Sequence, residues 1–166
     1  MSNVKYQMSN VKKGFTLVEL LVVITVMGFL MTVAFVAFDN ARSKARDAKR
    51  VANIDQLRKA LDLYFNSQGS YPIATSEIEL GTANYDVLCS GTSSGFKGDA
   101  SACGGNATIY IDHVPKAFGL NAGCTDAFLY SSSAGDDYDL KFCLEKKIGN
   151  IGPGSCTAKL GSVSCP

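Results

Sequence analysis

A single acidic residue, Glu19, stands inside the most apolar stretch of the chain. That stretch runs from Phe15 to Phe38, and Glu19 is its only charged residue. An ionised carboxylate is costly in an apolar environment, so it lies near an interface, takes up a proton or pairs with a cation. Cleavage after Gly14 would create such a cation, because the new ammonium on Phe15 would lie four residues before Glu19. The spacing therefore indicates charge pairing, of a kind that sets the axial register of one helix against another.

Six cysteines form the second set of reactive residues, and all of them follow the apolar stretch. The closest two are nine residues apart, so the sequence has no CxxC half-site for zinc. This distribution favours disulfides formed in an oxidising compartment, with a metal site or reduced thiols as the alternatives. Six cysteines allow many connectivities. We favour pairs of sequence neighbours, which are Cys89–Cys103, Cys124–Cys143 and Cys156–Cys165.

The sequence offers little for catalysis or for cofactor binding. His113 is the only histidine, and no Ser or Cys motif marks a nucleophile. The sequence has neither a P-loop nor a dinucleotide fingerprint. Asp136 and Asp137 follow a Ser- and Gly-rich run, which predicts an ordinary turn before a strand, with calcium binding as the alternative. We therefore expect no catalytic residues, no metal site and no cofactor.

The length of the apolar stretch predicts a membrane-spanning helix. Its roughly 24 residues, rising about 1.5 Å each, can cross a hydrocarbon core of about 30 Å. An ordinary secretory signal has a shorter apolar run with a cleavage site after it. Here Lys12, Lys13 and Gly14 all precede the apolar stretch, so cleavage after the stretch is not supported. A plain N-terminal membrane anchor is the simplest alternative.

The residues from Lys12 to Ile24, KKGFTLVELLVVI, resemble the class III signal of type IV prepilins and type II secretion pseudopilins. In that family a membrane aspartyl peptidase cuts after the glycine and methylates the new N-terminus. The resemblance implies that residues 1–14 are a leader that ends at Gly14. It also implies that Phe15 becomes the N-methylated first residue and that Glu19 is required for assembly.

The resemblance further implies a structural subunit, not an enzyme, that polymerises into a helical filament of its own copies. The implied partners are prepilin peptidase, an inner-membrane assembly platform and, before assembly, the inner membrane itself. The filament would be a cell-surface pilus or a periplasmic pseudopilus, with an extracytoplasmic head. A minor or tip pilin and a membrane-anchored extracytoplasmic binding module are the alternatives. Major pseudopilins bind calcium through an acidic loop, whereas no Asp or Glu follows Glu145 here, and a net charge of +1 gives no indication of nucleic-acid binding.

The charges on the two sides of the apolar stretch conflict over orientation. Five basic residues follow it between Arg42 and Arg50, whereas the leader has three lysines. A positive-inside count alone would therefore put the head in the cytoplasm. We give more weight to the cysteines and the processing motif, which favour an extracytoplasmic head. The leader repeats the sequence MSNVK, so translation from Met1 or Met8 gives a short basic leader in either case.

The helix is expected to continue well beyond the membrane. The first proline is Pro72, and no helix-ending residue lies near Phe38. We therefore predict one helix to about Phe65. It consists of a transmembrane and assembly part, residues 15–38, and an amphipathic extension, residues 39–65.

The extension has an apolar stripe that should pack against a globular head. Its members recur at steps of three and four and are Val51, Ile54, Leu57, Leu61 and Tyr64. Residues 39–50 offer only alanines on this face, which predicts a solvated or subunit-facing neck. Gly69 is placed to cap the end of the helix.

Residues 66–166 should form a disulfide-containing head with a small antiparallel sheet. Residues 73–105 are rich in small polar residues and predict a long loop, with one short helix or strand near Tyr85 to Leu88. The tail from Ile148 to Pro166 is Gly-rich and is expected to need a covalent tie. The predicted fold is therefore α+β and resembles the pilin fold. The predicted strands are Thr108–Ile111, Ala127–Tyr130 and Tyr138–Glu145, and the last alternates apolar and charged residues.

Overall fold

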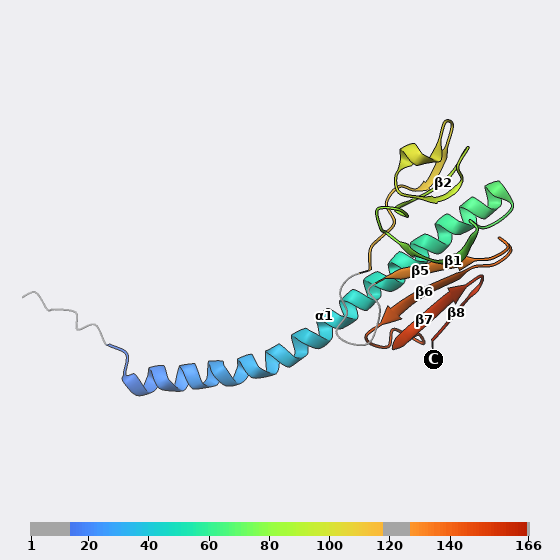
Figure 1. Cartoon of the computed structure of the whole chain (residues 1–166). Coiled ribbons are helices and arrows are strands. Elements are labelled where there is room, and N and C mark those ends of the chain that lie inside the picture. The colour runs from blue at the N-terminus through green and yellow to red at the C-terminus, as the bar shows by residue number, and fades with distance from the viewer. Residues whose placement is uncertain (1–13, 118–126, 166) are drawn as a thin grey trace, which may run out of the picture. The chain divides into compact units, whose positions relative to one another are not determined.

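The computed structural model describes residues 14–117 and 127–165, except for the side chain of Val36. The chain divides into two compact units, Met1–Asn40 and Ala41–Pro166. One long helix, α1 (Leu17–Gln68), contributes its first part to the first unit and its second part to the second unit (Figure 1).

The end of α1 is determined by a glycine. Gly69 has a φ of 76°, and its N–H donates to the carbonyl oxygen of Phe65 at 2.8 Å. This is a left-handed C-cap, a conformation that costs glycine little because it has no Cβ. The predicted cap is confirmed. The helix continues to Gln68, three residues past the predicted end at Phe65.

The part of α1 in the first unit exposes its large apolar side chains. Between Leu17 and Phe38, those that the structure describes range from 42% exposed at Val23 to 79% exposed at Leu17. A helix that is apolar on every side is stable in lipid or in a protein core, not in water. By length and composition α1 can cross a membrane, as the sequence predicts.

The second unit packs its part of α1 against a five-stranded sheet, alongside which the helix runs in Figure 1. The strand order is β1-β5-β6-β7-β8, and every neighbouring pair is antiparallel. The fold of the described chain is therefore α+β and pilin-like. The strands of this sheet are β1 (Ala74–Leu80), β5 (Phe128–Ser132), β6 (Asp139–Leu144), β7 (Gly154–Lys159) and β8 (Ser162–Ser164).

The apolar stripe of α1 and the inner face of the sheet share one core. Leu57 and Leu61 are fully buried, in the same cluster as Leu140 and Leu144 of β6. Full burial of one leucine side chain contributes about 2 kcal/mol. The predicted stripe and the predicted inner face of the last strand are both confirmed. The observed strands β5 and β6 differ from their predicted bounds by one or two residues at each end.

The predicted long loop over residues 73–105 is wrong, except for the short element expected near Tyr85 to Leu88, which is β2 (Val87–Ser90). This region contains β1 and a second, smaller antiparallel sheet with the strand order β3-β2-β4. Strand β1 has no clean apolar alternation, and it lies at the edge of the sheet beside β5. The prediction of β4 at Thr108–Ile111 is confirmed. The other elements here are β2 (Val87–Ser90), β3 (Gly95–Lys97) and the short 3₁₀ helix η1 (Ala100–Cys103).

The tail from Ile148 to Pro166, for which the sequence predicts a covalent tie but no strand, forms the hairpin of β7 and β8 and is tied by Cys156–Cys165. Its Gly, Ala and Lys residues have weak strand propensity. Strand β7 nevertheless pairs with β6 over five residues, from Leu140 opposite Ala158 to Leu144 opposite Gly154. Cross-strand pairing with a buried neighbour thus outweighs local propensity.

Disulfides tie both of the regions that local propensity leaves weak. Cys89 and Cys103 join β2 to η1, and Cys156 and Cys165 close the terminal hairpin. These two pairs are among the neighbour pairs that the sequence favours. Cys143 is also disulfide-bonded. Cys124, the partner expected from the sequence, lies outside the described residues.

Candidate assembly site at the start of the helix

Glu19 takes part in a capping box at the start of α1. The Thr16 N–H and Thr16 Oγ1 both donate to Glu19 Oε2, at 3.3 and 3.1 Å, and the Glu19 N–H donates to Thr16 Oγ1 at 3.3 Å. Two backbone N–H groups at the helix start are thereby satisfied by side chains. In the single chain, then, Glu19 has local hydrogen-bond partners but no side-chain cation among the described residues of the first unit.

The peptide bond between Gly14 and Phe15 is open to solvent. A Cβ built on Gly14 would meet no atom within 4 Å, and Phe15 is the most exposed large apolar residue described. Lys12 and Lys13, the basic part of the processing motif, lie outside the described residues. An accessible bond is the geometry that a peptidase needs, so cleavage here stays a prediction that the structure permits.

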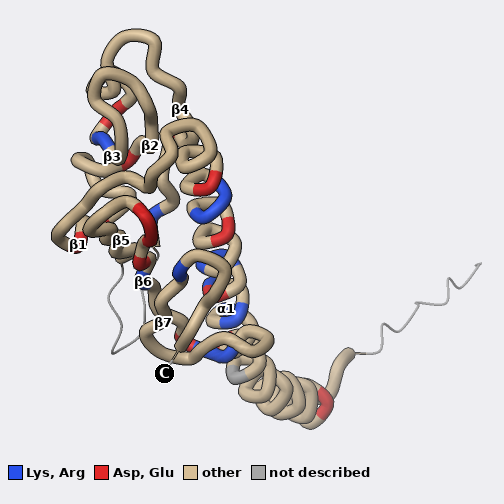
Figure 2. Tube along the Cα trace, turned by 90° about the vertical axis from the view of Figure 1, so that its right-hand side faces the viewer, with Lys and Arg blue, Asp and Glu red and all other residues tan. Residues whose placement is uncertain are grey.

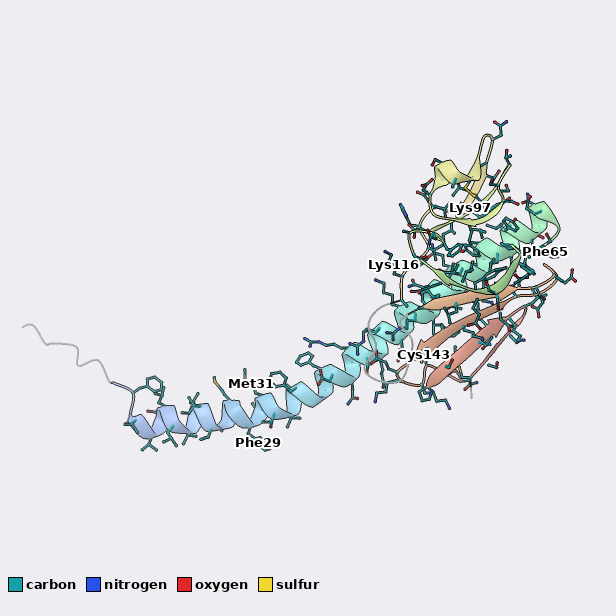
Figure 3. All side chains as sticks on the ribbon, in the orientation of Figure 1. Phe29, Met31, Phe65, Lys97, Lys116 and Cys143 are labelled. Carbon is teal, nitrogen blue, oxygen red and sulfur yellow. A yellow bond between two sulfur atoms is a disulfide. The ribbon has the colours of Figure 1, made fainter. Side chains whose placement is uncertain are left out.

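The threonine hydroxyls in the apolar part of α1 form hydrogen bonds within the helix. Thr25 and Thr32 donate their hydroxyls to the carbonyl oxygens of Val22 and Phe29, each at 2.8 Å. Such bonding satisfies hydroxyls where no water is present. Figure 2 shows how few charged residues this part of the helix has, and Figure 3 shows the labelled Phe29 and Met31 projecting outward. Apart from Glu19 the surface is suited to contact with lipid or with other apolar helices.

The predicted solvated or subunit-facing neck is wrong for two of its charged residues, although Arg42, Lys44 and Lys49 are exposed as predicted. Asp47 and Arg50 are 0% and 1% exposed, and Arg50 Nη1 donates to Asp47 Oδ1 at 2.7 Å. The carboxylate of Asp47 also accepts the backbone N–H groups of Glu145 and Lys146, at 3.0 and 2.7 Å. The neck of the helix is therefore fastened to the connection between β6 and β7.

Glu145 completes this buried ionic cluster from the sheet side. Arg46 donates to it through Nε and Nη2, both at 2.8 Å, and Arg50 Nη1 lies 3.3 Å from its Oε1. The hydrogen bonds from Arg46, then those from Arg50, lower the pKa of Glu145 from its ordinary value. The sequence carried a signal for the helix half of this cluster. Asp47 and Arg50 continue the spacing of the apolar stripe toward the N-terminus, with polar residues in place of apolar ones.

The remaining candidate residues show no catalytic arrangement. His113 lies on the surface with Nδ1 2.9 Å from Asp86 Oδ2, and this contact raises the pKa of the histidine. Asp136 lies in a bend before β6, as predicted, and Asp137 accepts the N–H of Tyr138 at 2.7 Å. Among the described residues no three His, Cys, Asp or Glu side chains are grouped to hold a metal ion.

Comparison with known proteins finds a family model at the N-terminal part of the chain and relatives that match about two fifths of the chain. Residues 9–35 match the family model described as the prokaryotic N-terminal methylation motif. The type IV major pilin protein PilE1 of Neisseria gonorrhoeae is 31% identical over 65 residues, which are 39% of this chain and 39% of that protein. No solved structure matches the chain significantly.

The second group of relatives belongs to a secretion system. The type II secretion system core protein G of Klebsiella michiganensis is 38% identical over 61 residues, 37% of this chain and 43% of that protein. The protein of the same name from Escherichia coli K12 is 34% identical over 68 residues, 41% of this chain and 47% of that protein. The matches therefore span less than half of the relatives' own length. The chain carries the methylation motif, and its homologues are type IV major pilins and a type II secretion pseudopilin.

Proposed function

We propose that this chain is a structural subunit of a type IV pilus or pseudopilus, polymerised through its N-terminal helix. The carrying observation is Glu19, the one charge at the start of a helix that exposes apolar side chains all round. In lipid alone the carboxylate does not stabilise such a helix, because the charge raises the free energy of insertion by a few kcal/mol. In a filament the carboxylate can exchange its bonds to Thr16 for the ammonium of a neighbouring Phe15.

The subunit passes through two environments. Prepilin peptidase removes residues 1–14 and methylates Phe15, and residues 15–38 anchor the precursor in the inner membrane. Residues 39–65 and the head, residues 66–166, lie outside the cytoplasm. An inner-membrane assembly platform then adds the subunit to a cell-surface or periplasmic filament. The subunit has no enzymatic activity and needs no cofactor for this role.

The test is mass spectrometry of the N-terminus from cells that carry the processing machinery. We expect a mature chain that begins with N-methylated Phe15. Gly14→Val should block the cut and leave the precursor in the membrane. Gly28→Val is the matched control, since a Cβ at either glycine meets no atom within 4 Å and only Gly14 precedes the expected cut. An intact leader in the wild type, or a cut after Phe38, would overturn the proposal.

The abundance of the chain in filaments distinguishes a major subunit from a minor or tip subunit. Sheared surface appendages and periplasmic fractions should be purified separately and their main protein identified. A major pilin dominates the first fraction and a major pseudopilin enters the second. A membrane-anchored binding module is found in neither filament fraction.

A further inference from the structure

A groove in the second unit lies between edge strands of its two sheets. Among the described strands, β1 pairs only with β5 in the larger sheet, and β3 pairs only with β2 in the smaller one. Figure 2 shows β1 and β3 on the same side of α1. The groove has a volume of about 490 Å³. Its walls include Thr75, Ser76 and Ile78 of β1 and Gly95, Phe96 and Lys97 of β3.

Consecutive residues of both strands line the groove, which places it along their edges. Successive side chains of a strand point to opposite faces of its sheet, so a cavity over one face meets every second residue. Here Ala74, Thr75 and Ser76 all line the groove, and so do the consecutive residues from Gly95 to Lys97. Main-chain N–H and C=O groups of the two edge strands therefore border the groove.

The wall formed by β1 includes residues that its sheet does not match. From Ala74 to Ile78 the strand β1 advances four residues, whereas β5 advances two, from Ser132 to Tyr130. Residues 75–77 consequently have no opposite residue in the register with β5. A bulge of this kind interrupts the ladder of hydrogen bonds. Main-chain donors and acceptors need partners, which are water in the free chain and can be a ligand in a complex.

The floor of the groove is aromatic, but it presents no free ring face. Tyr64, Tyr71, Phe96 and Tyr130 line it, and each is at most 6% exposed. Phe96 packs edge-on against Tyr130 with ring centroids 5.0 Å apart, and the Tyr130 hydroxyl donates to the carbonyl oxygen of Pro72 at 2.7 Å. A ligand that binds by stacking, such as a base, needs an exposed ring face. The binding groups that the groove offers are therefore those of its strand edges.

We propose that the groove binds an extended segment of another protein, which adds as a strand between β1 and β3. An extended peptide has main-chain donors and acceptors on both of its edges, and peptides bind free sheet edges in this way. Residues 74–78 span about 13 Å at most, enough to pair with about four residues of a ligand. A nucleic acid is a poor match, because Lys97 (labelled in Figure 3) is the only basic residue among those that line the groove.

The ligand strand belongs to a different protein and not to a second copy of this chain. A strand that enters the groove needs both of its edges free, one for β1 and one for β3. Every strand of the described chain uses at least one edge within its own sheet. The occupant is therefore a linear segment without a sheet of its own. This binding function goes beyond polymerisation, and a filament would carry one such groove on every subunit.

The test selects ligands without assuming their sequence. Random linear heptapeptides displayed on phage are selected against the full chain in a neutral detergent, and the affinity of enriched peptides is measured by fluorescence anisotropy. Hydrogen exchange followed by mass spectrometry then reports main-chain bonding. We expect an enriched peptide to slow the amide exchange of residues 74–78 and 95–97 by about fivefold or more. Residues 162–164 of β8, at the other edge of the larger sheet, should be unchanged.

Two neighbouring serines provide a matched pair of variants. Both are exposed, and Ser94 lines the groove whereas Ser93 does not. Ser94→Trp should fill the groove and weaken peptide binding by at least about tenfold. Ser93→Trp should leave the affinity unchanged. Ser76→Trp is an independent variant that fills the groove from β1, and the urea midpoint of each variant shows whether its head is folded.

The other outcomes overturn the inference in recognisable ways. Selection that enriches no peptide on the wild type over Ser94→Trp removes the groove as a peptide site. A peptide that slows no amide of β1 and β3, or that Ser93→Trp weakens as much as Ser94→Trp, binds elsewhere. Self-association of the chain that both Ser94→Trp and Ser76→Trp abolish assigns the groove to a second copy instead. None of these results depends on cleavage after Gly14, so this inference and the proposed function fail separately.

Discussion

The two parts of α1 are built for different surroundings although they form one helix. In the first unit the described large apolar side chains from Phe15 to Phe38 are exposed, and the carboxylate of Glu19 lies at the helix start. In the second unit the apolar side chains form one buried stripe, and the charges either face solvent or pair inside a cluster. The comparison teaches that the first part can bury its apolar surface only against lipid or another chain, whereas the second part buries its apolar stripe against its own sheet.

The sharpest way to break this comparison is to remove the charge of the first part. Glu19→Ala should leave cleavage after Gly14 and membrane insertion intact, and reduce sheared filaments by at least about tenfold, because the pairing with a neighbouring Phe15 ammonium is lost. Glu19→Asp should be intermediate, since the charge survives and its reach shortens by one methylene. Cleavage and filament yield are scored separately in cells without the wild-type copy. Normal filaments from Glu19→Ala would return Glu19 to the role of an interfacial residue.

Removal of the buried charge in the second part should instead unfold the head. Arg50→Met leaves the buried carboxylate of Asp47 without its cation, while Glu145 keeps its bonds to Arg46, and should cost about 3–5 kcal/mol of unfolding free energy. Urea unfolding of the full chain in neutral detergent, followed by the near-ultraviolet circular dichroism of its tyrosines, measures this loss. Lys59→Met is the matched control. It breaks an exposed ion pair between Lys59 and Asp55 on the same helix and should change the unfolding free energy little.

The same leucine truncation should lower the stability of the head strongly in the second part of α1 and not at all in the first part. Leu57 is 0% exposed and Leu21 is 51% exposed. Leu57→Ala should destabilise the head by about 3 kcal/mol, through lost burial and a residual cavity. Leu21→Ala should leave the urea midpoint of the head unchanged. An equal loss from both truncations would show that the first part of α1 packs on its own chain after all.

Disulfides should matter only to the second unit, which contains every cysteine. The Cys89–Cys103 bond spans 14 residues, and its loss in Cys89→Ala with Cys103→Ala should cost about 3 kcal/mol in the chain-entropy account. Membrane insertion of the first part should not change. Non-reducing peptide mapping of the wild type should find the Cys89–Cys103 and Cys156–Cys165 links, with Cys124 expected on Cys143. Free thiols throughout would contradict both the structure and an extracytoplasmic head.

The smallest expected effect is a change in pH dependence. Arg46 and Arg50 lower the pKa of Glu145, so its contribution to stability is fully present above the ordinary glutamate value. That contribution is lost as the pH falls through the lowered pKa. Below the ordinary glutamate pKa, the unfolding free energy of the wild type should decrease with falling pH, by up to the amount that uptake of about one proton causes. Glu145→Gln should remove this part of the pH dependence. An unchanged acid slope would show that the cluster does not couple Glu145 to folding.

Much of the fold could be predicted from local pattern. The helix, its cap at Gly69, the stripe around Leu57 and the strand Thr108–Ile111 all follow from spacing and residue type, because each is specified by residues close in sequence. The strands at residues 74–80 and 154–164 were missed. Their residues have weak propensity, and only pairing with distant neighbours makes them strands.

The sequence by itself determined the candidate assembly site, because Gly14, Phe15 and Glu19 lie within one short segment whose spacing is legible without a fold. Only the tertiary structure decided which of the charges at the base of the head are buried and paired. Asp47 and Glu145 are 98 residues apart in the chain, and their contact through the Glu145 N–H exists only once β6 lies against α1. That contact turns two arginines inward and brings Lys146 beside the helix. Long-range pairing of this kind depends on packing energy summed over the whole core, and no local pattern in the sequence specifies it.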